Sequence, residues 1–191
     1  MRNFHLLYFM SQRVERQEEL KRVLPVLSTH LETVAMTMAG EVTFLRAGLV
    51  NFGGRNLLFT DSSEHSLAEL STAFEELGAK VLSEQLVGVL PSGEVQIFPE
   101  KREPIKVDLV GIVGGPSSPT ADEAEAVTAG QASLHLFARA LNARTRTPEA
   151  LRTLSNLATK TKPVACSAGT VRTIAKNLKA QVAHAQVART R

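Results

Sequence analysis

Apolar and polar positions along the chain alternate with two different periods, which predicts a protein of mixed strands and helices. The clearest stretch covers residues 56–90. Its apolar start, 56–60, is typical of a buried strand, and alternation with a period of two returns over 80–90 as a further strand. The helix between them is predicted from four apolar residues on one face: Leu67, Leu70, Phe74 and Leu77. The acid and hydroxyl side chains that follow residue 60 can cap this helix.

The sequence before residue 56 predicts four shorter elements. They are a strand over 4–10, an amphipathic helix that starts near Arg13, a strand over 33–38 and a short helix over 40–47. Pro25 lacks the backbone donor that a helix interior needs. The first helix therefore either stops near Val23 or continues with a kink to Leu31.

Beyond residue 90 the pattern changes from strands to helices. A turn is predicted at 91–93, and strands at 95–98 and 105–113 lie on either side of a polar break. The Gly- and Pro-rich segment 114–119 indicates a boundary, and apolar residues at helical spacing then predict three helices. We expect an α/β (α+β) fold with two parts. They are a mixed sheet flanked by helices in residues 1–117 and a basic helical C-terminal region in residues 118–191.

Charge is divided unevenly along the chain. Residues 127–191 hold eleven Lys or Arg against a single acid, Glu149, whereas residues 1–126 hold eleven bases against eighteen acids. The net charge of +3 hides this division. A block of this kind favours phosphate-rich or acidic partners, and salt should weaken the attraction. A solvated helix face and a membrane-surface helix are the alternatives.

The composition also excludes some classes of protein. No apolar run approaches the roughly 20 residues that a membrane-spanning helix needs. Cys166 is the only cysteine, so an intrachain disulfide and multi-cysteine zinc patterns are excluded, and we expect an inert side chain. Residues 1–14 carry two Arg and no acid, which hints at an organellar presequence, although the apolar run inside them is more typical of a first strand.

Catalytic and cofactor motifs are weak. The five histidines have no ligand spacing, so no metal site is expected. A strand that runs into Gly114 and Gly115 is superficially similar to a phosphate-binding loop, but it lacks the Gly-Lys-Ser/Thr of a P-loop and the spacing of a dinucleotide-binding motif. No carboxylate pair or nucleophile lies in a recognisable catalytic frame, and we expect no cofactor.

Several short motifs occur in an order that resembles the large-subunit ribosomal protein ten family, the stalk-base proteins. Residues 52–61 read Phe-Gly-Gly-Arg-Asn-Leu-Leu-Phe-Thr-Asp, and residues 87–90 and 93–95 are similar to the family's strand and turn. Residues 136–143 are similar to its Leu-Val-Arg-Val-Leu-Asn-Ala segment. The resemblance covers roughly residues 4–160, including a predicted Arg-rich helix over 13–27. It rests on the order of the pieces, because each motif is short.

This resemblance implies a structural protein at the base of the ribosomal stalk. The implied partners are large-subunit ribosomal RNA, large-subunit ribosomal protein eleven and dimers of the acidic stalk protein. The expected phosphate contacts are Arg13, Arg16, Lys21, Arg22, Arg46 and Arg55. The expected anchors for the stalk protein are Leu151, Leu154 and Leu157, which equally suit packing within the chain's own fold.

The compartment and two other functions stay open at this stage. A short basic start and the residues beyond 162 suit an organellar, mitochondrial ribosome, and the cytoplasm is the alternative. A second hypothesis is a structural or assembly subunit of another mitochondrial complex, which binds an acidic protein through the basic end. A third is a small α/β enzyme that holds a phosphate ligand at Gly114 and Gly115.

Overall fold

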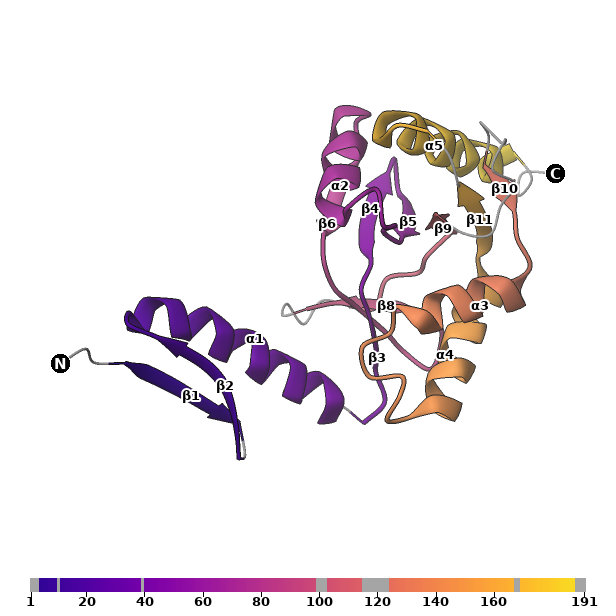
Figure 1. Ribbon diagram of the computed structural model, residues 1–191. Coiled ribbons are helices and arrows are strands. Elements are labelled where there is room, and N and C mark those ends of the chain that lie inside the picture. Colours follow the sequence, from indigo (N-terminus) through magenta and orange to yellow (C-terminus); the bar gives the residue numbers. More distant parts are fainter. Residues whose placement is uncertain are drawn as a thin grey trace. The chain divides into compact units, whose positions relative to one another are not determined.

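The computed structural model describes residues 4–9, 11–38, 40–98, 103–114, 124–166 and 169–187 (Figure 1). They fall into two compact units, Met1–Gly40 and Glu41–Arg191, which we call the N-terminal and C-terminal units. The fold class is mixed α/β, as the sequence predicts. The division differs from the predicted one, because it lies near residue 40 and not at 117.

The N-terminal unit is a β-hairpin with one long helix. Strand β1 (His5–Phe9) pairs with the antiparallel strand β2 (Gln12–Gln17), and helix α1 (Leu20–Met38) packs against both strands. Pro25 lies inside α1, so the helix continues past it and does not stop near Val23.

Two predicted elements of this unit are corrected. The predicted helix over 13–27 begins only at Leu20, because residues 12–17 find a strand partner in β1, and tertiary pairing of this kind overrides helix propensity. The predicted strand over 33–38 is the end of α1. Ala and Met are good helix formers and occupy three of these six positions, so helix propensity outweighs the alternating pattern there.

A six-stranded mixed sheet forms the centre of the C-terminal unit. Its spatial order is β10-β11-β9-β5-β4-β6, and β9 pairs in parallel with both β5 and β11. The strands are β4 (Gly48–Phe52), β5 (Arg55–Phe59), β6 (Lys80–Ser83), β9 (Leu109–Val113), β10 (Glu125–Ala126) and β11 (Lys162–Cys166). The strands predicted at 56–60 and 105–113 are confirmed in type, with different ends. The single strand predicted over 80–90 is two strands, because residues 80–83 pair with β4 in this sheet and residues 87–89 belong to another sheet.

A second sheet of three strands lies beside the first. It has the order β3-β7-β8, with β3 (Thr43–Leu45), β7 (Val87–Val89) and β8 (Val95–Ile97). The short helix predicted over 40–47 is therefore wrong. Residues 43–45 are all buried and pair with β7. A helix turn that faces solvent could not provide the backbone hydrogen bonds of this strand pairing.

Helices cover both faces of the central sheet (Figure 1). Helix α2 (Leu67–Glu76) packs beside α5 (Val171–Val187), and the two share one core with β5 and β9. Helix α3 (Ala129–Ala138) packs beside α4 (Thr147–Lys160) in the other core, together with the three-stranded sheet. Helix α2 is confirmed, but it is not capped by the predicted acid and hydroxyl side chains of residues 61–63. Its cap is Ser66, whose side chain accepts from the backbone of Glu69.

The basic C-terminal region is part of this unit and does not form a tail. Strand β11 lies between β9 and β10, so residues on either side of 117 build one sheet. Ile174 and Leu178 of α5 are buried in the same core as Leu109 of β9. The exposed Lys and Arg residues of 127–187, in the part that the structure describes, are therefore carried on the outside of a packed α/β unit.

Candidate nucleic-acid interface

A β-bulge brings Arg13 and Arg16 onto one face of the hairpin. The register runs from Leu6 opposite Arg16 to Tyr8 opposite Arg13, with an irregularity after Leu7 that leaves Val14 as the extra residue. Residues three apart on a regular strand point to opposite faces. Here the extra residue places both arginines on the same face. Leu6 and Tyr8 are two residues apart and share a face of β1, and each arginine lies on the face of the residue directly opposite it.

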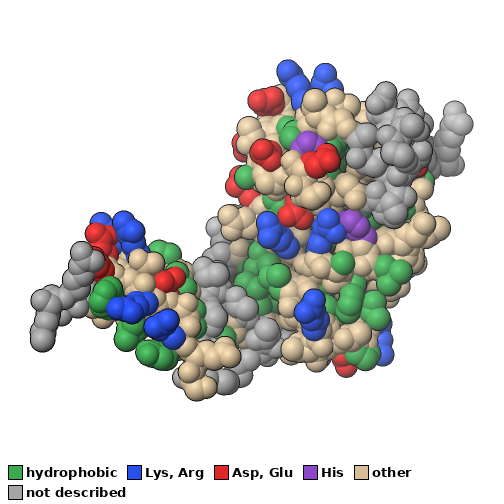
Figure 2. Space-filling model, viewed as in Figure 1, with side chains coloured by type: hydrophobic (Ala, Val, Ile, Leu, Met, Phe, Trp, Pro, Cys, Tyr) green, Lys and Arg blue, Asp and Glu red, His purple; other side chains and the backbone are tan. Residues whose placement is uncertain are grey.

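Aromatic side chains share this face with the two arginines. Phe4, Leu6 and Tyr8 alternate along β1 and are 40%, 49% and 57% exposed. The guanidinium carbon of Arg16 lies 3.8 Å from the centroid of the Phe4 ring, which is a cation–π contact. We call these five residues, Phe4, Leu6, Tyr8, Arg13 and Arg16, the hairpin face. Basic and apolar side chains lie next to each other on this unit in Figure 2.

The one acid of the described hairpin lies on the opposite face. Glu15 opposes Leu7, and its carboxylate accepts hydrogen bonds from the backbone of Arg16 and from the side chain of Gln17. The hairpin face therefore carries two positive charges with no carboxylate among its own residues. Such a surface attracts the phosphates of a nucleic acid whatever its base sequence.

Lys21 and Arg22 are less available to an anion. Both lie at the start of α1 and form ion pairs with Glu19, at 3.2 Å and 3.3 Å. Their side chains are largely exposed, so these pairs are weak, but Glu19 offsets part of their charge. Of the four predicted contacts in this unit, Arg13 and Arg16 are the better placed.

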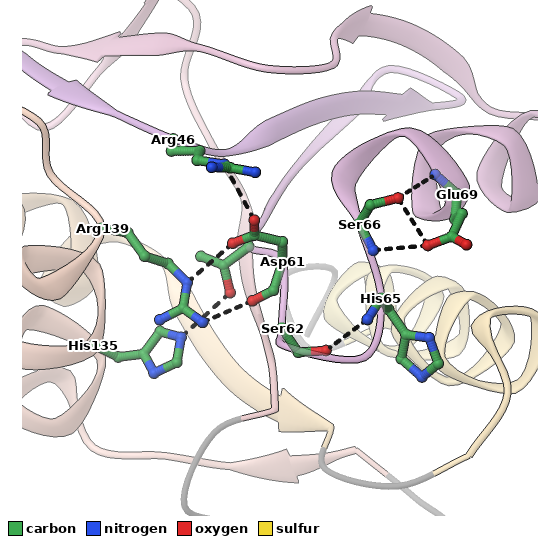
Figure 3. A network of polar contacts seen from close by, with 9 residues as sticks. Arg46, Asp61, Ser62, His65, Ser66, Glu69, His135 and Arg139 are labelled. Carbon is green, nitrogen blue, oxygen red and sulfur yellow. Dashed lines mark hydrogen bonds and ion pairs between the residues drawn. The ribbon is translucent and has the colours of Figure 1, made fainter.

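In the C-terminal unit, Arg46 belongs to a polar network and is not a free cation (Figure 3). Arg46 follows β3, and its Nε lies 3.2 Å from a carboxylate oxygen of Asp61. Asp61 itself lies just beyond the end of β5. Arg139, at the end of α3, donates from its side chain to both the carboxylate and the backbone carbonyl of Asp61. The side chain of Arg46 is 62% exposed, so this guanidinium is held by Asp61 and still reaches solvent.

His135 and Thr60 extend the network beneath Arg139. The ring Nε2 of His135 lies 3.4 Å from the hydroxyl of Thr60, which also accepts from the backbone N–H of Val113. Burial and the nearby positive charge of Arg139 lower the pKa of His135 to about 4, although Asp61 acts against the shift. His135 is therefore neutral at neutral pH and adds no charge to this surface.

Arg55 does not join Arg46 in one surface. It is the first residue of β5 and is half-buried, whereas Asp61 and its partners lie beyond the other end of the same strand. A strand rises about 3.3 Å per residue, so the two ends lie more than about 13 Å apart. Within the C-terminal unit, Arg46 and Arg55 thus lie in separate places and do not form a single patch.

The predicted stalk-protein anchors are largely buried. Leu154 and Leu157 are 0% exposed and pack in the core with Leu136, and Leu151 is half-buried. Their spacing reflects packing of α4 onto its own unit, as the alternative interpretation held. A partner could reach Leu154 and Leu157 only if the unit opened.

The phosphate-loop hypothesis falls on a shallow cavity at the ends of β5 and β9. Gly114 has a φ of +70° and borders a cavity of about 190 Å³ that Ser62, His65 and Ile174 also line. Two of its polar side chains already have partners, because Ser62 accepts from the backbone of His65 and the ring of His65 contacts the carbonyl of Gly169. Gly115 lies outside the described residues.

Other chemistry in the described part of the chain is sparse. Cys166 is buried, and burial raises the pKa of its thiol to about 11, so almost no thiolate exists at neutral pH. Within residues 4–187, gaps excepted, no His, Cys, Asp or Glu form a group of three that could hold a metal ion. In the same residues no helix is both long and apolar enough for a bilayer.

Comparisons with family models, with curated proteins and with solved structures found no match to this chain. The functional argument therefore rests on the residues themselves. Sequence reasoning missed Phe4 and Tyr8, because it assigned the arginines that face them to a helix. The available signal was the alternation of aromatic and apolar residues over 4–8, directly before a short polar run that can pair with it.

Proposed function

We propose that this chain is a structural, RNA-binding component of a large ribosomal subunit and has no catalytic role. The observation that carries the proposal is the hairpin face. There, Arg13 and Arg16 are exposed, lie next to aromatic rings and share the face with no acid of the described hairpin. Arg residues in this setting bind phosphate oxygens, and the neighbouring rings suit bases.

The build of the N-terminal unit supports a role inside an assembly. It has about 40 residues, and folded units of this size usually depend on a partner or a cross-link for stability. Leu20, Leu24 and Leu31 of α1 are at least half exposed, in addition to the apolar residues of the hairpin face. A unit with this much uncovered apolar surface is typical of an extension that packs onto a larger particle.

The ribosomal part of the proposal rests on the resemblance within the C-terminal unit. The motif at 52–61 forms the turn into β5, and those at 87–90 and 93–95 form β7, a turn and β8, in the expected order. Residues 13–47 fold as elements other than those that the resemblance implies. We therefore propose RNA as the partner of the hairpin face and propose no stalk-protein contact through Leu154 and Leu157.

Exposed cations of the C-terminal unit supply further phosphate contacts. Arg152 lies on α4, and Arg172 and Lys176 lie on α5, and all three side chains are exposed. Helices α4 and α5 belong to the cores on opposite faces of the sheet, so these charges spread around the unit. This distribution favours non-specific attraction to RNA over a single binding groove.

Sedimentation of the tagged protein through a sucrose gradient tests the assembly. We expect co-migration with large-subunit ribosomal RNA, identified by sequencing the RNA of the peak fractions, and loss of this migration after ribonuclease treatment. Migration in a nuclease-resistant complex without ribosomal RNA would contradict the proposal and favour a subunit of another complex, held by an acidic protein.

Two double variants test the surface. Arg13→Ala with Arg16→Ala removes two positive charges from the hairpin face, and Lys21→Ala with Arg22→Ala removes two from the neighbouring ion pairs with Glu19. We expect the first pair to weaken RNA binding several-fold more than the second. Equal effects would show that only the total charge matters and that the hairpin face is not the contact surface.

A further inference from the structure

We propose that the hairpin face is a stacking platform for unpaired bases, so that the N-terminal unit binds single-stranded RNA in preference to duplex. The inference rests on the proposed RNA-binding function and names the class of RNA that the same surface takes. Phosphate attraction alone would not favour single strands, because a duplex carries the same charged groups at a higher density. The aromatic side chains supply the distinction.

The two rings are far enough apart to contact two different bases of an extended strand. Phe4 and Tyr8 lie on the same side of β1, four residues apart, so their positions are separated by about 13 Å. Leu6 lies between them and keeps the intervening surface apolar. Every base has an aromatic face, so a ring–base contact tolerates any sequence and contributes about 1–3 kcal/mol per base.

The two arginines lie where the RNA backbone would pass beside those bases. Arg13 is directly opposite Tyr8, and Arg16 is directly opposite Leu6 and covers the ring of Phe4. The bulge at Val14 is what places both of them beside the rings. Tyr8 is 57% exposed against 40% for Phe4, so Tyr8 is the ring more open to a base.

Charge decides between RNA and an apolar protein surface as the occupant. A protein partner that only covered Phe4, Leu6 and Tyr8 would bury two guanidinium groups with no carboxylate of the hairpin face to pair with them, at a high desolvation cost. RNA supplies the phosphates for Arg13 and Arg16 and the ring faces for Phe4 and Tyr8. In duplex RNA the base faces are stacked on each other and the rings cannot reach them.

The composition of the chain provides a direct probe. Tyr8 is the only Tyr and the chain has no Trp, so the intrinsic fluorescence of the whole protein reports on one ring of the hairpin face. A base that stacks on Tyr8 quenches this emission. Titration of the full chain with unstructured oligouridine, corrected for absorbance with free N-acetyltyrosinamide, measures stacking, and fluorescence anisotropy of labelled RNA measures binding.

We expect saturable quenching by oligouridine and little quenching by a duplex of equal length. Tyr8→Ala should weaken binding to oligouridine about tenfold, whereas Tyr8→Phe should bind as the wild type does. Leu31→Ala is the matched control, because it removes an exposed apolar side chain from α1 of the same unit and should leave binding unchanged.

The possible failures are distinguishable. RNA that binds by anisotropy without quenching Tyr8, or with equal affinity for duplex, would overturn the stacking platform and leave the RNA-binding function in place. RNA that does not bind the full chain at all would overturn both. Quenching of Tyr8 by an acidic or apolar protein fraction and not by oligouridine would assign the hairpin face to a protein partner and overturn the inference.

Discussion

Arg139 holds Asp61 by two groups at once, although the residues are 78 positions apart in sequence. Its Nε lies 3.3 Å from the carboxylate, and one terminal nitrogen donates to the backbone carbonyl at 2.8 Å. This contact joins the end of α3 to the end of β5. It also positions the Asp61 carboxylate that pairs with Arg46. The position of the exposed Arg46 guanidinium therefore depends on Arg139, at the end of α3.

Arg139→Ala should destabilise the chain by about 1–3 kcal/mol, because it removes the donor to a largely buried carboxylate and leaves Asp61 with Arg46 alone. Arg46→Ala should cost less than about 1 kcal/mol, because its side chain is mostly exposed. Urea unfolding followed by circular dichroism measures both. The reverse order of the two effects would show that Asp61 depends on Arg46 and not on Arg139.

The stability of the chain should fall as the pH falls from about 6.5 towards 4, because of His135. Its pKa is about 4 in the folded chain against an ordinary value of 6.5, so the unfolded chain binds the extra proton in this window. The folded state therefore has the full contribution of His135 above about pH 6.5 and loses it progressively below. Because the ring is only half-buried, we expect a loss of about 1–2 kcal/mol at pH 5.

Comparison with His135→Leu isolates this contribution. The variant has no titrating group at the site and a side chain of similar size, so the free energy of unfolding should change less between pH 7.5 and 5 than in the wild type. Urea unfolding at the two pH values gives the difference directly. An equal change in both proteins would show that other groups cause the acid sensitivity.

The two buried leucines of α4 should act through stability and not through a partner. Leu154→Ala or Leu157→Ala should each cost about 2–5 kcal/mol, because each leaves a cavity in a closed core. Leu134→Ala on α3 is the matched control, since this side chain is 66% exposed and its loss should be close to neutral. A Leu157→Ala chain of wild-type stability that loses a protein partner would restore the stalk-anchor interpretation.

Local patterns in the sequence predict an element correctly where that element packs on segments close to it in sequence. The apolar run before Asp61 and the spaced apolar residues of α2 correctly predict a strand and a capped helix. The pattern at 33–38 misled because β-branched Thr and Val are mixed there with Ala and Met. Only the register of a partner strand distinguishes a strand of this composition from a helix end. No such partner exists for these residues in the described chain.

Long-range pairing accounts for the other differences. Nothing local indicates that 162–166 enters the central sheet, because its partner β9 lies about 50 residues earlier and the Gly- and Pro-rich segment between them is typical of a domain boundary. The hairpin face depends in the same way on the pairing of two short strands and on one extra residue at Val14. The resemblance pointed to Arg13 and Arg16, but their arrangement beside Phe4 and Tyr8 follows from the register alone.

Binding of single-stranded RNA should depend less steeply on salt when the hairpin face is changed. Each phosphate contact on a single strand contributes about 0.7 to the slope of log affinity against log salt concentration, through released counterions. Arg13→Ala with Arg16→Ala should therefore lower the slope by about 1.4, whereas Tyr8→Ala should lower the affinity and leave the slope unchanged, since stacking releases no counterions. Anisotropy titrations at several potassium chloride concentrations measure both quantities. A lower slope for Tyr8→Ala would mean that loss of the ring also moves the arginines, and an unchanged slope for the double arginine variant would mean that the phosphates bind elsewhere on the chain.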